Sequence, residues 1–227
     1  MTKAEAIKGI TDFDDEFEVT VANTPELVNE AYKLRYQVYC QERSFLEGKD
    51  GTETDEFDKY SYHVLLVNRA SREVVGCARL IVGSVSRPNS SFPIQRLYKG
   101  ALPPGLPGGV CAEVSRFAIS KARRSASSTA LMRLALVRGL VRLSGQLGIT
   151  YWCAVMEPSL LRLLHATSIV FHPLGPLVEY HGLRQPCWNH VGDLLDRVAS
   201  DRPALWEFLT LGGTLWNPAI REMSLAA

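Results

Sequence analysis

The sequence predicts a mixed α/β fold in which a β-sheet is covered by helices. Short apolar segments with strand periodicity alternate with amphipathic segments in the order β-α-β-β-β-α-β-α-β. Of the 227 residues, 46% are hydrophobic and the net charge is +1, which is typical of a globular protein with a core. We predict a polar N-terminal arm at residues 1–15 and a single domain at residues 16–227.

The first half of the domain contains one predicted helix and three predicted strands. Thr24 is a helix N-cap and Pro25 suits the first helical turn, so a helix should run from Pro25 to about Cys40. The acidic segment Gln41–Lys59 should be a loop. The strands are expected at Phe17–Val21, Tyr62–Val67 and Val74–Val82.

The second half begins with Gly83–Gly109, which is rich in proline, glycine and serine and should be a functional or mobile loop. A buried strand from Cys111, a basic turn and a long helix to Gln146 follow. Further elements are a strand at Ile149–Met156, a short helix after Pro158, a hairpin of Val170–Pro173 with Leu177–His181, and helices at Val191–Ala199 and Pro203–Thr210.

Two charged residues, Glu113 and Arg116, lie in the otherwise apolar central strand. Burying an unpaired charge is costly, so both should either pair with neighbours or have a function. A regular strand would point them to opposite faces, whereas a β-bulge could direct both to one cleft. If the site transfers an acyl group to an amine, a partly desolvated Glu113 is a plausible general base.

The turn after this strand is basic and serine-rich. A helix N-terminus beside arginines is suited to bind a phosphate. We therefore predict that a phosphorylated carrier binds here; the residues are Lys121, Arg123, Arg124, Ser127 and Ser128. Arg133, Arg138 and Arg142 on the next helix either form a docking face for an acidic carrier protein or are solvated.

Three other polar groups could have a binding or a structural role. The carboxylates between Glu53 and Asp58 could frame an amine-bearing substrate, pair with Arg35 and Arg79, or form a solvated face. His63 is interpreted as a satisfied core histidine. The cluster Tyr180–Arg184 is either a wall of the acceptor pocket or a structural turn.

The sequence disfavours several classes of protein. The 5 cysteines are widely spaced, without a CxxC or Cys/His cluster, so neither zinc nor a disulfide framework is predicted. We expect no bound metal. The N-terminus lacks a signal peptide pattern, no apolar stretch approaches the roughly 20 residues of a membrane span, and a cytoplasmic location is expected. The basic patch lacks interleaved aromatic residues, which disfavours nucleic acid.

Four short motifs in order resemble the acyl-homoserine-lactone synthases, which have the GNAT-type acyltransferase fold. They are Arg35-Tyr36-Gln37-Val38-Tyr39, Glu53-x-Asp55-x-Phe57-Asp58, Gly76-x-x-Arg79-Leu80 and Glu113-Val114-Ser115-Arg116-Phe117. From about Phe17 to Trp216 the chain also resembles the PEP-CTERM/exosortase system-associated acyltransferases, a group similar to N-acyl amino acid synthases. Stretches such as AEVSRFAISKARR and GITYWCAVMEPSLLRLL carry this resemblance.

This resemblance implies a GNAT-like fold with a splayed central strand, and it implies roles for individual residues. Glu113 matches the proposed base and Arg116 the catalytic-site arginine beside it. The turn from Lys121 to Ser128 corresponds to the pantetheine phosphate site. The substrate pocket is implied to include Arg35, Tyr39, Asp55, Asp58, Arg79 and Phe117.

The resulting functional hypothesis is an N-acyltransferase that makes an N-acyl amino acid. The acyl group would come from acyl carrier protein, or coenzyme A, as a thioester co-substrate without a permanently bound cofactor. Lactone synthases carry a tryptophan shortly after the first helix, whereas the nearest aromatic residue here is Phe45, and Tyr39 stands where they carry a phenylalanine. With the insert Gly83–Gly109 and the longer C-terminus, these differences favour a simple amino acid over S-adenosylmethionine. The alternatives are a lactone synthase that uses S-adenosylmethionine and a non-catalytic acyl-carrier or lipid-binding module.

Overall fold

The computed structural model describes residues 12–84, 86, 90–97, 110–123 and 126–216, without the side chains of 123 and 126–128. Its eight-stranded sheet has the order β1-β2-β3-β4-β5-β8-β6, and β7 pairs with β8. The contacts divide the chain into two compact units. The first contains Met1–Leu80 and Arg116–Leu140, and the second contains Ile81–Ser115 and Val141–Ala227.

The first unit contains the strands and helices that hold most of the charged motif residues. Its strands are β1 (Phe17–Val21), β2 (Ser61–Asn68), most of β3 (Val74–Val82) and the end of β4 (Cys111–Ile119). Its helices are α2 (Pro25–Arg35), the π-helix η1 (Tyr36–Glu42), the 3-10 turns η2 (Asp58–Tyr60) and η4 (Lys121–Arg123), and the first part of α4 (Ala126–Leu147). The predicted bounds of β1 and β3 are confirmed.

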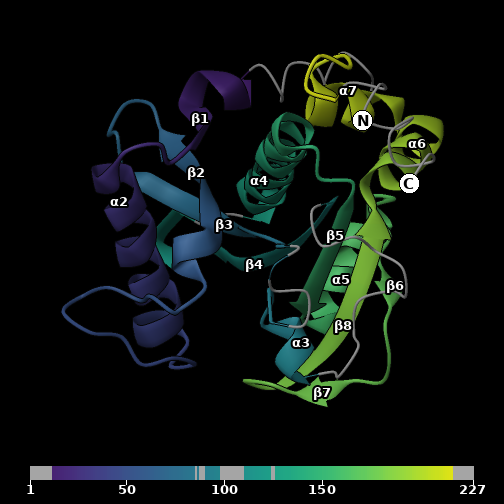
Figure 1. The fold of residues 1–227 in the computed structure, drawn as a ribbon. Helices are drawn as coiled ribbons and strands as arrows, with labels where there is room; N and C mark the ends of the chain where they lie inside the picture. The colour runs from purple at the N-terminus through teal and green to yellow at the C-terminus, as the bar shows by residue number, and fades with distance from the viewer. Residues whose placement is uncertain (1–11, 85, 87–89, 98–109, 124–125, 217–227) are drawn as a thin grey trace. The chain divides into compact units, whose positions relative to one another are not determined.

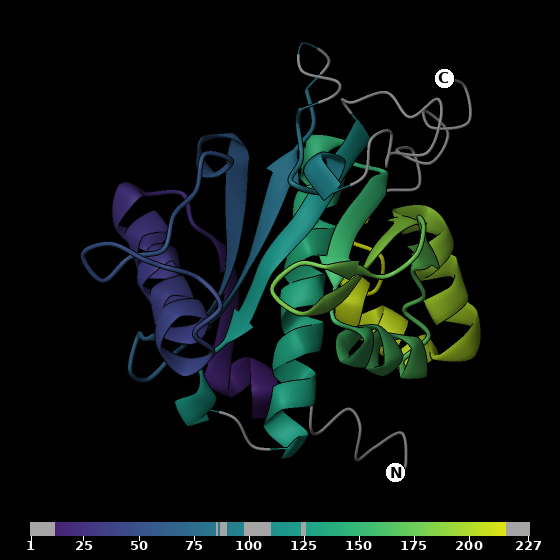
Figure 2. The same cartoon turned by 90° about the horizontal axis from the view of Figure 1, so that it is seen from below.

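Helices α2 and α4 lie on opposite faces of β2 and β3 in the first unit (Figure 2). Leu65 and Val67 of β2 pack in one cluster with Leu34 of α2. On the other face, a Cβ at Gly139 of α4 would overlap Val64, so the helix backbone approaches β2 closely. The two-residue alternation of β2 therefore supplies both cores.

The helix predicted to reach Cys40 is α-helical only to Arg35, and a π-helix continues it to Glu42. Tyr39 Oη donates to the Phe117 carbonyl, and Glu42 Oε1 accepts from the Lys121 N–H at 3.1 Å. These contacts with β4 and the turn after it favour the wider, π-helical turn. No periodicity in the sequence revealed it. π-helical segments often occur at functional sites.

The second unit contains a set of strands around β8 (Leu183–His190), which the sequence analysis did not predict. β8 pairs antiparallel with β5 (Tyr151–Met156) over six residues (Figure 1). The predicted hairpin is wrong, because β6 (His172–Pro173) and β7 (Val178–Glu179) each pair with β8 and not with one another. The other elements are α3 (Ile94–Leu97), α5 (Pro158–Ala166), α6 (Val191–Asp201) and α7 (Pro203–Thr210).

Two segments predicted to lack structure are partly ordered. Residues 12–16 are helical and Phe13 is buried, so the predicted arm contributes to the core at this end; residues 1–11 lie outside the described part. Within the predicted loop Gly83–Gly109, Phe92 and Ile94 are fully buried beside the short helix α3. No helix among the described residues is long and apolar enough to cross a membrane.

Candidate functional site

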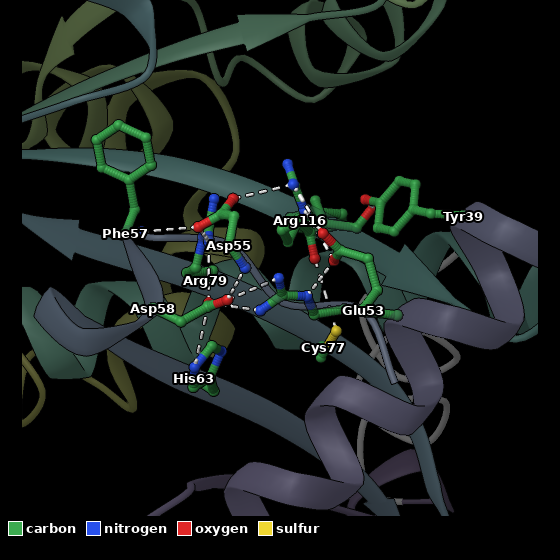
Figure 3. A network of polar contacts seen from close by, with 11 residues as sticks. Tyr39, Glu53, Asp55, Phe57, Asp58, His63, Cys77, Arg79 and Arg116 are labelled. Atoms are coloured by element: carbon green, nitrogen blue, oxygen red, sulfur yellow. Dashed lines mark hydrogen bonds and ion pairs between the residues drawn. The ribbon is translucent and has the colours of Figure 1, made fainter. Parts of the chain in front are cut away.

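A network of three arginines and three carboxylates lies in the first unit (Figure 3). Helix α2, β3 and β4 each provide one arginine, and the segment before β2 provides the carboxylates. The arginines are Arg35, Arg79 and Arg116, and the carboxylates are Glu53, Asp55 and Asp58. The charges balance, which is the condition under which buried ionic groups are tolerated.

Arg35 is the centre of this network and is fully buried. Its Nε donates to Glu53 Oε2 at 2.6 Å, and its Nη1 and Nη2 donate to the two oxygens of Asp58 at 2.6 and 3.1 Å. Bidentate pairing of this kind fixes both partners. Arg35 thus anchors the C-terminus of α2 to the acidic segment.

Arg79 shares Asp58 with Arg35, Arg116 shares Glu53 with Arg35, and both also bind Asp55. Arg79 Nη1 lies 2.6 Å from Asp55 Oδ1 and 2.9 Å from Asp58 Oδ1. Arg116 Nη2 donates to Glu53 Oε1 at 2.9 Å and to Asp55 Oδ2 at 3.0 Å. The prediction that the acidic run pairs with Arg35 and Arg79 is confirmed, and the solvated-face interpretation is wrong.

The carboxylates of the network stay ionised. Burial alone would raise the pKa of each, but hydrogen bonds and charges from the arginines outweigh it and lower the pKa of Glu53, Asp55 and Asp58. Arg116 is the largest such influence on Glu53, Arg79 on Asp55 and Arg35 on Asp58. The network is therefore a fixed array of charges at neutral pH.

One side of the array is accessible. The Asp55 side chain is 25% exposed and Arg116 15%, whereas Glu53 is 3% and Asp58 6% exposed. The guanidinium of Arg116 also lies over the Tyr39 ring, 5.8 Å from its centroid. A small charged molecule would therefore meet Asp55 and Arg116 first, with Tyr39 beside them.

The structure brings together all the predicted substrate-binding residues of this region, because Tyr39 Oη bonds the Phe117 carbonyl at 3.1 Å. Burial raises the pKa of Tyr39, so its hydroxyl stays protonated and donates. Glu53 was predicted only as a member of the acidic run and not as a pocket residue, although it links Arg35 to Arg116. Its place at the start of the acidic motif was the available signal.

Strand β4 deviates from a regular strand where the sequence predicted a bulge. Arg116 has a left-handed backbone conformation with φ of 49°, which bends a strand as a β-bulge does. The parallel pairing of β4 with β5 covers only Cys111, Ala112 and Glu113. The bulge or splay predicted between Glu113 and Lys121 is confirmed, while the strand itself continues from Cys111 to Ile119.

Glu113 belongs to the second unit and is 2% exposed. Its Oε2 accepts a hydrogen bond of 2.9 Å from the backbone N–H of Ile94, at the start of α3. The carboxylate lies close enough to Cys153 and Cys187 to contribute, after burial, to the raised pKa of both thiols. Both cysteines therefore remain protonated, which makes them poor nucleophiles.

The predicted phosphate turn is only partly described. The Lys121 side chain is exposed, but its backbone N–H is taken by Glu42. Arg124 and the side chains of Arg123, Ser127 and Ser128 lie outside the described residues, so their binding of a phosphate stays a prediction.

The basic face predicted on α4 is wrong for one of its arginines. Arg138 is 7% exposed, and its Nη2 and Nη1 bind the two oxygens of Asp14 at 2.7 and 3.1 Å. It therefore holds the N-terminal segment to α4 and is not available to a carrier protein. In the second unit, Arg184 lies 3.4 Å from Glu157 and donates to the Leu183 carbonyl, which supports the structural-turn interpretation.

No group of three or more metal-ligating side chains that could hold a metal ion occurs in the described part of the chain. The chemistry that the network of the first unit offers is electrostatic binding of a small charged molecule.

His63 of β2 is buried beside the network, as predicted, but the prediction that it is satisfied is wrong. Neither ring nitrogen has a hydrogen-bond partner among the described residues, and Nε2 lies 3.8 Å from Asp58 Oδ1. Burial and the charge of Arg35 lower the pKa of His63 from 6.5 to about 4. His63 is therefore neutral in the folded protein.

This burial predicts a pH dependence of stability. The unfolded chain binds a proton at His63 near pH 6.5 and the folded chain only near pH 4. The free energy of unfolding should therefore fall as the pH is lowered through this interval. From about pH 7 to about pH 5 the loss should be about 2 kcal/mol. The network carboxylates, whose ordinary pKa is about 4, affect the pH dependence of stability mainly below about pH 5.

Replacing the unpartnered ring should remove the effect. We expect His63→Leu to be at least as stable as the wild type at neutral pH, because a buried polar group without a partner is lost. Urea denaturation at the two pH values measures both quantities. An equal loss of stability in the variant and the wild type would show that another group titrates.

Comparison with known proteins identifies the fold. Residues 34–134 match the family model described as acetyltransferase (GNAT) domain. Among solved structures, TofI in a ternary complex with an inhibitor and MTA superimposes with a TM-score of 0.64 at 22% identity, over 90% of this chain and 99% of that chain. The fold is GNAT-like. The predicted mixed sheet flanked by helices is thereby confirmed.

Two further structures share this GNAT-like fold. FeeM, an N-acyl amino acid synthase from uncultured soil microbes, has a TM-score of 0.59 at 16% identity, covering 80% of this chain and 93% of that chain. The CoA-dependent acyl-homoserine lactone synthase BjaI, with SAM and isopentyl-CoA, has a TM-score of 0.61 at 23% identity. The match covers 81% of this chain and 89% of that chain. No curated protein matches the sequence.

Proposed function

We propose that this protein is an N-acyltransferase that moves a fatty acyl group from a thioester to the α-amine of an amino acid. The observation that carries the proposal is the irregular strand β4. Glu113 and Arg116 lie three residues apart on it, one a buried carboxylate and the other part of the charged network.

The proposed chemistry assigns one role to each charged group. The network binds the amino acid, with Asp55 receiving the ammonium and Arg116 the carboxylate. Glu113 takes a proton from the ammonium, and the resulting amine attacks the thioester carbonyl. The C–S bond breaks, the thiol leaves with a proton, and an amide remains. Direct attack is favoured because burial raises the pKa of the Cys77, Cys153 and Cys187 thiols.

Acyl carrier protein is the proposed acyl donor, with coenzyme A as the alternative. The turn from Lys121 would hold the pantetheine phosphate through residues other than the Lys121 N–H, which Glu42 occupies. Association with an exosortase system and a cytoplasmic location stay predictions.

Lactone formation is the competing assignment, because several structures with this fold are acyl-homoserine lactone synthases. Mass spectrometry of lipid extracts from cells that express the chain distinguishes the two. Feeding ¹⁵N-labelled amino acids should label an acyl amide that is absent from cells with the empty vector. An acyl-homoserine lactone labelled from methionine would replace our proposal by the synthase, and no new lipid would favour a binding module.

We propose Asp55 as the carboxylate that meets the amine, and its contacts and exposure support this role. Within the described residues its Oδ2 accepts one hydrogen bond, from Arg116, and its side chain is the most exposed carboxylate of the network. We expect Asp55→Asn to raise KM for the amino acid about tenfold or more, because one charge-assisted contact is lost. Its kcat should change less. Steady-state kinetics with each substrate varied in turn measure this.

The neighbouring variant Glu56→Gln is the matched control, because it removes the same charge from an exposed position of the same segment. It should leave both constants unchanged. An equal rise in the KM of the thioester in Asp55→Asn would contradict the assignment, since it would indicate a general loss of structure.

A further inference from the structure

The second unit contains a cavity that the proposed reaction does not use. Its volume is about 370 Å³, within the range of small-molecule sites. Its walls come from β8, α6, the segment before β6 and His172 of β6. The residues that matter for recognition are Val170, Asn189, Asp193, Leu194, Arg197 and Asp201.

Asn189 is the buried polar group in the wall of this cavity. It is 3% exposed, and its Nδ2 donates to the Val170 carbonyl, which fixes the amide. Its Oδ1 has no hydrogen-bond partner among the described residues. A buried acceptor without a donor costs about 1–3 kcal/mol, so a ligand that brings an N–H or O–H to Oδ1 would be favoured.

The charges around the cavity indicate the sign of the ligand. Two carboxylates, Asp193 and Asp201, line it together with one guanidinium, Arg197. Asp193 and Asp201 side chains are 76% and 48% exposed. Asp193 Oδ1 lies 3.0 Å from His190 Nδ1, and Arg197 Nε lies 3.8 Å from Asp201 Oδ2, beyond hydrogen-bond distance. The excess negative charge favours a positively charged donor. Val170 and Leu194 add apolar surface.

We propose that this cavity binds a small molecule with a primary ammonium group. The ammonium donates to Asn189 Oδ1, and Asp193 and Asp201 balance its charge. A short aliphatic part lies against Val170 and Leu194. Two sources share this chemistry, namely free amino acids and aliphatic diamines. An amino acid would also place its carboxylate on Arg197, whereas a diamine would not need that residue.

Titration calorimetry on the full-length protein tests the proposal, with 1,4-diaminobutane and L-leucine as probes. Butanoate, which has a carboxylate but no ammonium group, is the control. We expect at least one amine to bind and butanoate not to bind. The double variant Asp193→Asn with Asp201→Asn should weaken that binding about tenfold or more. Asp196→Asn removes one charge from the same helix outside the cavity and should bind as the wild type does.

A second set of variants separates the sources and checks the buried group. Arg197→Gln should weaken L-leucine but not the diamine. Asn189→Leu should abolish binding, and a far-ultraviolet spectrum and urea denaturation show whether it is folded. No heat and no amide chemical-shift change in the wild type with either amine would overturn the proposal. Binding that survives the double variant unchanged would overturn it as well. Neither result depends on acyl transfer.

Discussion

Replacing Arg35 with methionine is expected to lower the free energy of unfolding by about 3–5 kcal/mol, because it leaves buried carboxylates without their partner. Arg35 is fully buried and forms three hydrogen bonds, one to Glu53 and two to Asp58. Methionine has a similar volume, so the loss measures charge and not a cavity. Urea denaturation followed by far-ultraviolet circular dichroism gives the value.

Lys33→Met on the same helix is the matched control. Lys33 pairs with Glu30 at the surface, where the side chains are 53% and 45% exposed. This change should cost under about 1 kcal/mol, since surface ion pairs contribute little. Similar losses for the two variants would show that the network is not a structural element of the first unit.

Replacing Glu113 with glutamine is expected to reduce kcat about 10²- to 10⁴-fold, which is the usual contribution of a general base. The amide oxygen of glutamine can still accept the N–H of Ile94, so the packing around α3 should persist. KM for the thioester should change little, because Glu113 acts on the amine. Steady-state assays of amide formation measure both constants.

Glu179→Gln is the control for this variant, because the glutamine oxygen can still accept the Gly182 N–H that Glu179 binds. It should retain wild-type turnover. Unchanged turnover in Glu113→Gln would remove the base assignment while leaving the fold and the network intact. A variant of Glu113 that has lost its unfolding transition would indicate a structural role for this carboxylate.

The sequence predicted most elements because their periodicity was strong. The bounds of β1, β3 and α7 agree with the structure, and each segment has a clear apolar pattern. β8 was missed because Pro186 and several polar residues interrupt its pattern. It forms because β5, β6 and β7 all pair with it, which is information that lies outside the segment.

The site could be predicted at the level of residue types but not of partners. The order of the charged motifs indicated that Arg35, Arg79 and the acidic segment belong together. Which carboxylate bridges which arginine depends on how α2, β3 and β4 meet, and no periodicity encodes this. For Arg138 the predicted exposure itself was wrong, because this basic residue on a helix is buried against Asp14.

Acyl transfer on this protein is proposed to occur directly from a thioester to an amine. The most direct measurement is a single turnover with a defined acyl thioester and a ¹⁵N-labelled amino acid, sampled by mass spectrometry of both the products and the intact protein. The account predicts an N-acyl amino acid and a free thiol in equal amounts, with no acylated protein at any time. An acylated cysteine, or thiol release that does not require the amine, would contradict it.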